Sequence, residues 1–576
     1  MKTYGSLEIT NNKNGDEALF VFKDLEPHVV MRLKQIFTKI APYKTKTFSL
    51  PFTDTVSADI VWFTSRYPMR ISKSDLSKLK SKSKKHYKKQ NEIEEILLPN
   101  YSSKEKRALK DGFALRDYQG VAVDVASKVK KMLLVDEMGL GKTIEGLAMG
   151  LIKGNLPIVF IVEAQLQIQW GQMAEKFVDL SVHLPKGNTP YSLPKADVYI
   201  FKYSQLSSWA DVLSRGWVKA IVFDEVQNLR TGMNSAKGIA AKTICDSVDF
   251  IVGMTGTLVY NYGIECWNIA NIIKPGLLGT KHEFLREWCT ADGADKGIVK
   301  DPDALGSYLR EENFLLRRTR ADIGEVVRQK KPEIIKVSAD KKSVGALEDL
   351  LESLAVTMLT STVGSDVMSS SSQFDLRLRQ LTGISKAKET ATFVRMLIEQ
   401  GSPVLLFGYH REVYRIWEEE LGDLNPAWFT GSESISKKEK EKQRFLNGET
   451  DLIIMSLHSG AGVDGLQKRC KNAVFGELDW SKSRHQQCIS RVDRAEQMDD
   501  VYVYFILSDF GSDPVMVDLL GVKSEQSRGI QDPGVTPLVL EADKDRVKNM
   551  ARNYLKSKGI TVEEPKVEVE DASSIL

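Results

Sequence analysis

Short apolar runs rich in β-branched residues alternate with longer stretches of helical spacing from about residue 113 onward. Such runs are typical of strands buried on both faces, and the stretches between them are long enough for crossover helices. This rhythm predicts a parallel sheet with helices on both sides. The expected strands of this first series are Met132–Val135, Ile158–Val162, Val198–Phe201, Ala220–Phe223 and Phe250–Gly253.

A second series of the same kind follows a serine-rich stretch, Ser369–Ser372, which we interpret as a break. A middle segment of mostly helical pattern, from about residue 262 to 380, separates the two series. Two similar α/β lobes are therefore expected. The expected strands of the second lobe are Val404–Phe407, Leu452–Met455, Ala473–Phe475 and Val501–Ile506.

The first hundred residues have a different pattern. Leu19–Phe22 predicts a strand, Val29–Ile40 has helical spacing, and Ser49–Phe63 again looks extended. A small α+β domain is expected here. Lysines then crowd together between residues 78 and 89 around Tyr87. That segment is an exposed helix or a linker, and its lysines either grip phosphates or are only solvated.

These patterns divide the chain into four parts. We expect an accessory domain with a basic linker at 1–105 and a first lobe at 106–335, with a helical insertion from about 262. A helical connector and the second lobe should occupy 336–540. The tail at 541–576 is expected to be partly disordered, because its last residues are acidic and of low complexity.

Composition narrows the class of protein. A chain of 576 residues exceeds one ordinary core. No apolar run is long enough to cross a bilayer, and the N-terminal residues are not those of a signal peptide. The 5 cysteines are widely spaced and lack a C-x-x-C pair, which argues for reduced thiols and against a zinc module. A net charge of +3 does not by itself imply a nucleic-acid partner.

A glycine-containing loop follows the expected strand Met132–Val135 and precedes a helix that should start near Thr143. Its glycines let successive backbone N–H groups point at phosphate oxygens. We expect Lys142 to reach the β- and γ-phosphates and the Thr143 hydroxyl to bind Mg²⁺. Asp136 stands where the usual pattern has glycine, so the loop alone fits a tight strand–helix turn equally well. The loop residues expected to contact the nucleotide are Met138, Gly139, Leu140, Gly141, Lys142 and Thr143.

Two carboxylates end the expected strand Ala220–Phe223, at the edge where doubly wound folds place chemistry. Asp224 would hold Mg²⁺, and Glu225 would orient and deprotonate an attacking water. For an isolated pair, two solvated side chains are the commoner interpretation, and the phosphate loop upstream reverses that preference.

Basic residues near the end of the second lobe could complete this site. Ser483–Val492 can form a helix, with Gln487, Arg491 and Arg494 on nearly one face. Guanidinium groups suit the charge that develops on a transferring phosphoryl group. The alternative is a solvated basic helix face.

Together these strings resemble the motifs of the Swi/Snf family of DNA-dependent ATPases, in helicase superfamily two, over about Leu115 to Lys523. Asp136 at the irregular loop position is what this family usually carries. Phe475–Leu478 and Phe284–Cys289 look most similar to the annealing-helicase, fork-remodelling branch. Gln227 departs from the histidine usual in the family, which puts the coupling between nucleotide and DNA in doubt.

The resemblance also implies roles for individual residues. Gln119, in Leu115–Gln119, looks like the family's adenine reader. Trp170, Thr257 and Trp480 correspond to elements of the family that face nucleic acid.

The function implied by the resemblance is that of an ATP hydrolase built from two RecA-like lobes, with ATP and Mg²⁺ as cofactors. It would translocate on DNA, duplex or branched, and remodel DNA structures or DNA-bound complexes. Two alternatives remain open: a strand-separating helicase on DNA or RNA, and an ATP-gated DNA-binding scaffold with little turnover. No membrane partner is expected. A bacterial or virus-infected cytoplasm, or a nucleus in a eukaryote, is the expected compartment.

Overall fold

The structure is a computed structural model in which contacts divide the chain into two compact units. One unit comprises Met1–Arg107 and Ala114–Lys130, and the other Ala108–Phe113 and Lys131–Leu576. The residues that the structure describes are 2–11, 18–37, 40, 43–103, 109–256, 258, 262–290, 297–324, 329–330, 332–340, 345–361, 364–458, 463, 465–480, 482–494, 497–514, 516 and 546–562.

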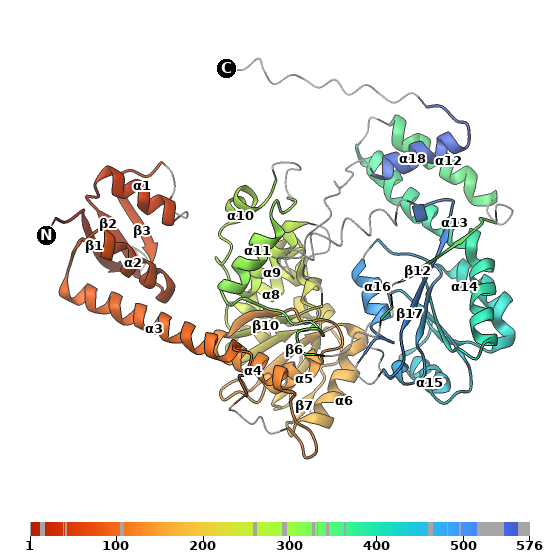
Figure 1. Cartoon of the computed structure of the whole chain (residues 1–576), viewed down its shortest axis with the longest axis horizontal. Coiled ribbons are helices and arrows are strands. Elements are labelled where there is room, and N and C mark those ends of the chain that lie inside the picture. The colour runs from red at the N-terminus through yellow and green to blue at the C-terminus, as the bar shows by residue number, and fades with distance from the viewer. Residues whose placement is uncertain are drawn as a thin grey trace. The chain divides into compact units, whose positions relative to one another are not determined.

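The first unit contains a four-stranded sheet in the order β3-β2-β1-β4 (Figure 1). β1 pairs antiparallel with β2 and parallel with β4, and β2 pairs antiparallel with β3. Phe20, Phe22 and Phe48 from the sheet are fully buried against the helices. The elements are β1 (Ser6–Asn11), β2 (Ala18–Lys23), α1 (Pro27–Ile36), β3 (Thr47–Pro51), α2 (Asp54–Arg66), β4 (Arg70–Ile71), α3 (Lys73–Leu97) and α4 (Asp117–Val129).

One expectation for this unit is wrong. The segment Ser49–Phe63 is extended only as far as Pro51, where β3 ends, and the helix α2 follows. The hydroxyl of Thr53 accepts a hydrogen bond from the backbone N–H of Val56 and so caps the helix N-terminus. The buried residues of α2 recur at helical spacing, and this local pattern outweighs the β-branched composition.

The first lobe of the second unit is a seven-stranded sheet in which every pairing is parallel, in the order β11-β5-β10-β9-β6-β8-β7 (Figure 1). The central strands are buried along their whole length, as the apolar runs predicted. Its strands are β5 (Lys131–Leu134), β6 (Ile158–Val162), β7 (Val182–His183), β8 (Val198–Lys202), β9 (Ala220–Phe223), β10 (Phe250–Met254) and β11 (Leu315–Leu316). Its helices are α5 (Lys142–Met149), α6 (Gln167–Phe177), α7 (Leu206–Leu213), α8 (Ala236–Cys245), α9 (Gly263–Ile273), α10 (Lys281–Trp288) and α11 (Pro302–Glu311).

The second lobe is a six-stranded sheet, again parallel throughout, in the order β12-β17-β16-β13-β15-β14. Along β13, Leu405 and Phe407 enter one apolar core and Val404 and Leu406 enter another, so both faces of this sheet are covered. Its strands are β12 (Glu333–Val337), β13 (Val404–Gly408), β14 (Ala427–Phe429), β15 (Leu452–Ser456), β16 (Asn472–Phe475) and β17 (Tyr502–Ser508). Its helices are α12 (Gly345–Thr360), α13 (Gly364–Glu399), α14 (Arg411–Leu421), α15 (Ile435–Leu446), α16 (Lys482–Ile489) and α18 (Arg546–Ser557).

Two parallel, helix-covered sheets confirm the expected α/β class. The serine-rich stretch Ser369–Ser372 is not a break, because it lies inside α13. Serine is a mediocre helix former but does not interrupt the backbone hydrogen bonds, as proline would. Within the segment expected as a tail, α18 packs on α12 and α13 through Tyr554 and Leu555. Among the described residues, no helix is both long and apolar enough to cross a membrane.

Candidate nucleotide-binding site

The predicted phosphate loop connects β5 to α5, and the helix begins at Lys142 itself. Gly139 and Gly141 have φ values of 93° and 86°, a left-handed conformation that a side chain would strain. The ammonium group of Lys142 donates to the carbonyl oxygens of Asp136 at 2.6 Å and Glu137 at 3.2 Å. The lysine therefore folds over the loop that it closes, at the N-terminus of a helix, where anions are favoured.

Asp136, the irregular residue of this loop, is completely buried. Its Oδ1 accepts hydrogen bonds from the backbone N and Nε of Arg318 at 2.9 and 3.1 Å, and Nη2 of the same arginine contacts Oδ2. That nitrogen also donates to Glu145 Oε1 at 2.8 Å. One guanidinium thus neutralises two buried carboxylates. Burial and the nearby charge of Asp136 still raise the pKa of Glu145 to about 8.

The two predicted catalytic carboxylates follow β9, and β10 alone separates β9 from β5 in the sheet. The indole Nε1 of Trp170 donates to Asp224 Oδ2 at 3.0 Å. Burial, followed by repulsion from Glu225, raises the pKa of Asp224 to about 7. Glu225 has φ 49°, and its Oε2 accepts a hydrogen bond from Gln227 Nε2 at 2.6 Å. Both carboxylates are thereby held by neighbouring side chains.

The charges of these groups act on one another. Burial lowers the pKa of Lys142, and the negative charges of Asp136, Glu225, Glu145 and Asp224 oppose that shift. The mutual repulsion of Asp224 and Glu225 is the kind that a divalent cation relieves. Carboxylate and hydroxyl oxygens are the ligands that Mg²⁺ prefers, and Thr143 is the second residue of α5. The donor set present here therefore fits magnesium.

Arg320 connects this loop to the second lobe. Its side chain is buried, and Nη2 donates to the carbonyl oxygen of Met138 at 3.2 Å. Nη1 donates to Asp493 Oδ1 at 2.6 Å, and Nη2 also contacts the carbonyl oxygen of Asp493. A Cβ on Gly139 would come within 2.9 Å of this guanidinium, so the loop needs glycine there for a second reason. Asp493 lies between the two predicted arginines, and its segment thus reaches the phosphate loop.

The helix expected over Ser483–Val492 is shorter than predicted, since α16 ends at Ile489. Arg491 and Arg494 lie just after it, in hydrogen-bonded turns. Arg491 Nε donates to the carbonyl oxygen of Gln487 at 3.1 Å, and its Nη1 donates to that of Val463. Arg494 Nε donates to the carbonyl oxygen of Ser490 at 2.6 Å. Backbone carbonyls thus fix both guanidinium groups in place.

The residues expected to face nucleic acid differ in their burial and contacts. Trp170 is 1% exposed and packs on Phe160 with 4.9 Å between the ring centroids, so it is a core residue in this structure. Its place on α6 makes it a support for Asp224. Trp480 is partly buried, and its Nε1 donates to both carboxylate oxygens of Asp375 at 3.1 and 3.0 Å. Thr257 lies outside the described residues.

Gln119, the expected adenine reader, belongs to the first unit. It is buried near the start of α4, where its Oε1 accepts a hydrogen bond from the backbone N of Arg116 at 3.0 Å. Sequence reasoning placed neither Arg318 nor Arg320 in the site. Both lie between Phe314 and Asp322, a segment whose sequence gives no hint of which acidic partners they meet.

Comparison with known proteins gives the family. A model of the SNF2-related domain matches residues 60–383, more than half of the chain. An uncharacterized ATP-dependent helicase, MG018, of Mycoplasma genitalium is 23% identical over 65% of this chain and 38% of its own length. The DNA annealing helicase and endonuclease ZRANB3 of Mus musculus is 21% identical over 69% of this chain and 38% of its own. The chain thus spans about two fifths of the length of these relatives.

Two further matches are similarly distant in sequence. The uncharacterized ATP-dependent helicase YqhH of Bacillus subtilis is 22% identical over 67% of this chain and 73% of its own length. Among solved structures, the SWI2/SNF2 ATPase core of Sulfolobus solfataricus in complex with dsDNA covers 75% of this chain and 96% of its own, with 19% identity and a TM-score of 0.36. The extent of the domain match confirms the expected family, and this chain belongs to the SNF2-related proteins.

Proposed function

We propose that this protein is a DNA-dependent ATPase that moves along DNA and remodels DNA structures or DNA-bound complexes. The observation that carries the proposal is the Arg320 contact, which joins the carbonyl of Met138 in the phosphate loop to Asp493 in the second lobe. A nucleotide in the loop would then be sensed by both lobes. The family supports ATP as the nucleotide, and ZRANB3, named as a DNA annealing helicase, supports DNA as the partner.

In this proposal each side chain has its own role in ATP hydrolysis. Lys142 leaves the carbonyls of its own loop and binds the β- and γ-phosphate oxygens. Thr143 and Asp224 would hold magnesium, which would neutralise charge on the phosphates. Glu225, oriented by its hydrogen bond from Gln227, positions the attacking water and accepts its proton. Arg494 stabilises the charge on the transferring phosphoryl group.

Movement follows because the contacts to the γ-phosphate differ between the closed arrangement of the two lobes and the arrangement after hydrolysis. ATP favours a closed arrangement because only there do Lys142 and Arg494 touch one γ-phosphate, and hydrolysis removes that shared contact. DNA is gripped mainly through its phosphates, so movement is largely independent of base sequence. Duplex or branched DNA is the proposed track.

Phosphate release tests the proposal. We expect slow release without nucleic acid and a rise of at least tenfold with duplex or forked DNA, against a smaller rise with RNA. Lys142→Ala should abolish the stimulated release but keep DNA binding at low salt. Lys153→Ala is the matched control, because Lys153 is exposed and lies in the same lobe. Equal release in the presence and absence of every nucleic acid would reject the proposal.

A strand-separating helicase is the second candidate, because the bacterial relatives are named as ATP-dependent helicases. Two displacement assays on one preparation discriminate between the candidates. A translocase on duplex DNA displaces the third strand of a triplex and leaves a plain duplex intact, whereas a helicase separates the duplex. An ATP-gated scaffold would show neither displacement nor stimulated phosphate release.

A further inference from the structure

The first unit exposes a row of lysines along α3. Lys80, Lys84 and Lys88 are spaced four residues apart, so they share one face of the helix and recur about every 6 Å along its axis. All three side chains are exposed. Such a row forms a regular line of positive charge that can meet several negative charges of one partner at once.

Three other lysines of the same helix already have acidic partners. Lys82 and Lys85 lie 3.0 and 3.4 Å from the carboxylate of Asp54 on α2, and Lys78 lies 3.9 Å from Asp75. Within the described part of the chain, neither Lys80 nor Lys84 forms an ion pair. Lys88 contacts Glu92 at 3.9 Å, so Lys80 and Lys84 are the members of the row whose charge stays uncompensated.

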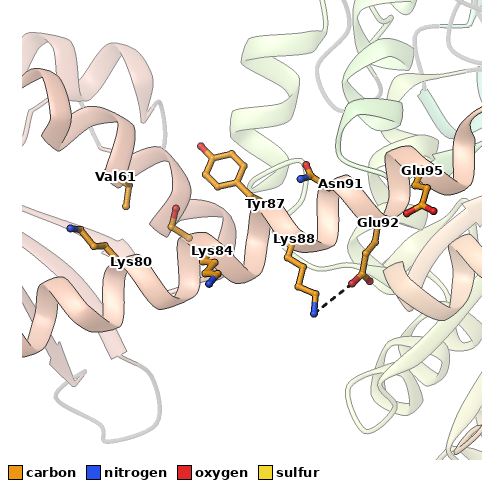
Figure 2. A pocket seen from close by; sticks show the side chains of 9 residues that line it. Val61, Lys80, Lys84, Tyr87, Lys88, Asn91, Glu92 and Glu95 are labelled. Carbon is orange, nitrogen blue, oxygen red and sulfur yellow. Dashed lines mark ion pairs between the residues drawn. The ribbon is translucent and has the colours of Figure 1, made fainter.

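An aromatic ring accompanies these lysines. Tyr87 is 51% exposed although it is large and mostly apolar. It lines an open hollow of about 710 Å³ on the surface of the unit, and Figure 2 shows it on the opposite side of α3 from Lys88 and Glu92, which form an ion pair. The hollow is lined by Val61, Lys80, Ser83, Lys84, Tyr87, Lys88, Asn91, Glu92 and Glu95.

We propose that the face of α3 formed by Lys80, Lys84 and Tyr87, at spacings of four and three residues, is a docking surface for a single strand of DNA, with the two lysines on neighbouring phosphates and Tyr87 stacked on a base. Lysines beside an exposed aromatic ring are the arrangement that binds single strands without sequence preference. This surface goes beyond the proposed function because it binds DNA without nucleotide and lies outside the two lobes.

The same residues explain why the occupant is a short single strand. A duplex keeps its bases stacked and would leave the Tyr87 ring unused, and an acidic peptide has no base to place on it. The surface offers two lysines and one ring, so it holds about two phosphates and one base.

Binding of fluorescein-labelled oligothymidylate to the full chain, measured by anisotropy without ATP at several salt concentrations, tests the proposal. The double variant Lys80→Ala and Lys84→Ala should bind at least tenfold more weakly at low salt. Its slope of log affinity against log salt should be smaller by about 1.4, since each lost phosphate contact on a single strand contributes roughly 0.7.

The matched control is Lys82→Ala and Lys85→Ala, which removes the same charge from the same helix but only from lysines already paired with Asp54. It should bind within about twofold of the wild type. Equal losses in the two double variants would overturn the proposal, because the net charge alone would then explain the binding.

Tyr87 provides an independent readout. Tyr87→Ala should weaken binding of the single strand about fivefold or more and leave a duplex of equal length unaffected, whereas Tyr87→Phe should retain affinity. An equal loss for duplex would contradict the stacked base, and polyglutamate binding as tightly as the oligonucleotide would indicate an acidic protein partner instead. Because no ATP is present, failure of DNA-stimulated hydrolysis would not change these outcomes.

Discussion

Arg320 donates from Nη1 to Oδ1 of Asp493 at 2.6 Å, although 173 residues separate the two along the chain. Both side chains are largely buried, with 5% and 10% exposed. The other end of the guanidinium contacts the carbonyl of Met138. Since Met138 belongs to the phosphate loop and Asp493 follows α16, this pair makes a continuous connection between the nucleotide site and the second lobe.

Breaking this ion pair should lower the free energy of unfolding. Asp493→Ala leaves a buried cation without its carboxylate, and we expect a loss of about 3 kcal/mol in the free energy of unfolding. Replacing both residues, with Arg320→Met and Asp493→Ala, should cost much less than the two single changes together, because no charge then stays buried. Denaturant unfolding of the four proteins of this double-mutant cycle measures the coupling.

The exposed pair of Arg395 and Asp423, at 2.7 Å, serves as the control in the same lobe. Water screens that pair, so Asp423→Ala should change stability far less than Asp493→Ala does. Additive single changes in the Arg320–Asp493 cycle would show that the two residues are not energetically coupled.

Trp170 should act through Asp224. Trp170→Phe keeps an aromatic ring against Phe160 but removes the Nε1 donor that holds the carboxylate. Loss of such an outer partner of a metal-binding carboxylate typically costs 10- to 100-fold in metal affinity or activity. We therefore expect the Mg²⁺ concentration for half-maximal phosphate release to rise by roughly that factor.

Trp209 offers a matched control for this change. It is a fully buried tryptophan of the same lobe, on α7, and its Nε1 has no hydrogen-bond partner in the described part of the structure. Trp209→Phe should leave the Mg²⁺ requirement unchanged. An unchanged requirement in Trp170→Phe as well would assign the first tryptophan to packing alone.

The pattern of apolar runs was sufficient to predict the two parallel sheets because strands covered on both faces must be apolar throughout. The loop at Lys142 and the carboxylates after β9 could also be located, since each lies within a few residues of a strand end. The partners Arg318 and Arg320 could not be, because they meet Asp136 and Met138 only after β11 pairs with β5.

Trp170 shows a second limit of prediction from the sequence. A tryptophan near a motif can be a surface contact or a core residue, and the sequence does not distinguish them. The structure does so through its 1% exposure. The helix α2 was mispredicted for a related reason, since Ile60 and Phe63 suit a strand by composition and a helix by spacing, and the Thr53 cap favours the helix.

His485 should make the second lobe sensitive to acid. It is buried and accepts a hydrogen bond at Nε2 from the backbone N of Asp479 at 3.1 Å. Burial lowers its pKa to about 4; the charge of Asp479 opposes this shift, and the charges of Arg379, Arg484 and Lys386 add to it. In the unfolded chain the pKa returns to about 6.5.

Below pH 6.5 the unfolded chain therefore binds a proton at His485 that the folded protein does not bind until about pH 4. Stability should fall as pH drops through this window, by roughly 3 kcal/mol in total. His485→Gln keeps an acceptor for the backbone N–H but cannot titrate. The gap in thermal midpoint between wild type and this variant should narrow from pH 7 to pH 4.5, and a constant gap would exclude the histidine as the cause.

The most direct test of the account concerns Lys142 and Arg494, which are claimed to act on one triphosphate from two lobes. ATP affinity and duplex-stimulated hydrolysis should be measured side by side on Arg494→Ala, with the exposed Arg415→Ala as the control in the second lobe. We predict that Arg494→Ala binds ATP within about threefold of the wild type but hydrolyses it at least about 10³-fold more slowly. Stimulated hydrolysis equal to that of the wild type would contradict the shared site and, with it, the motor.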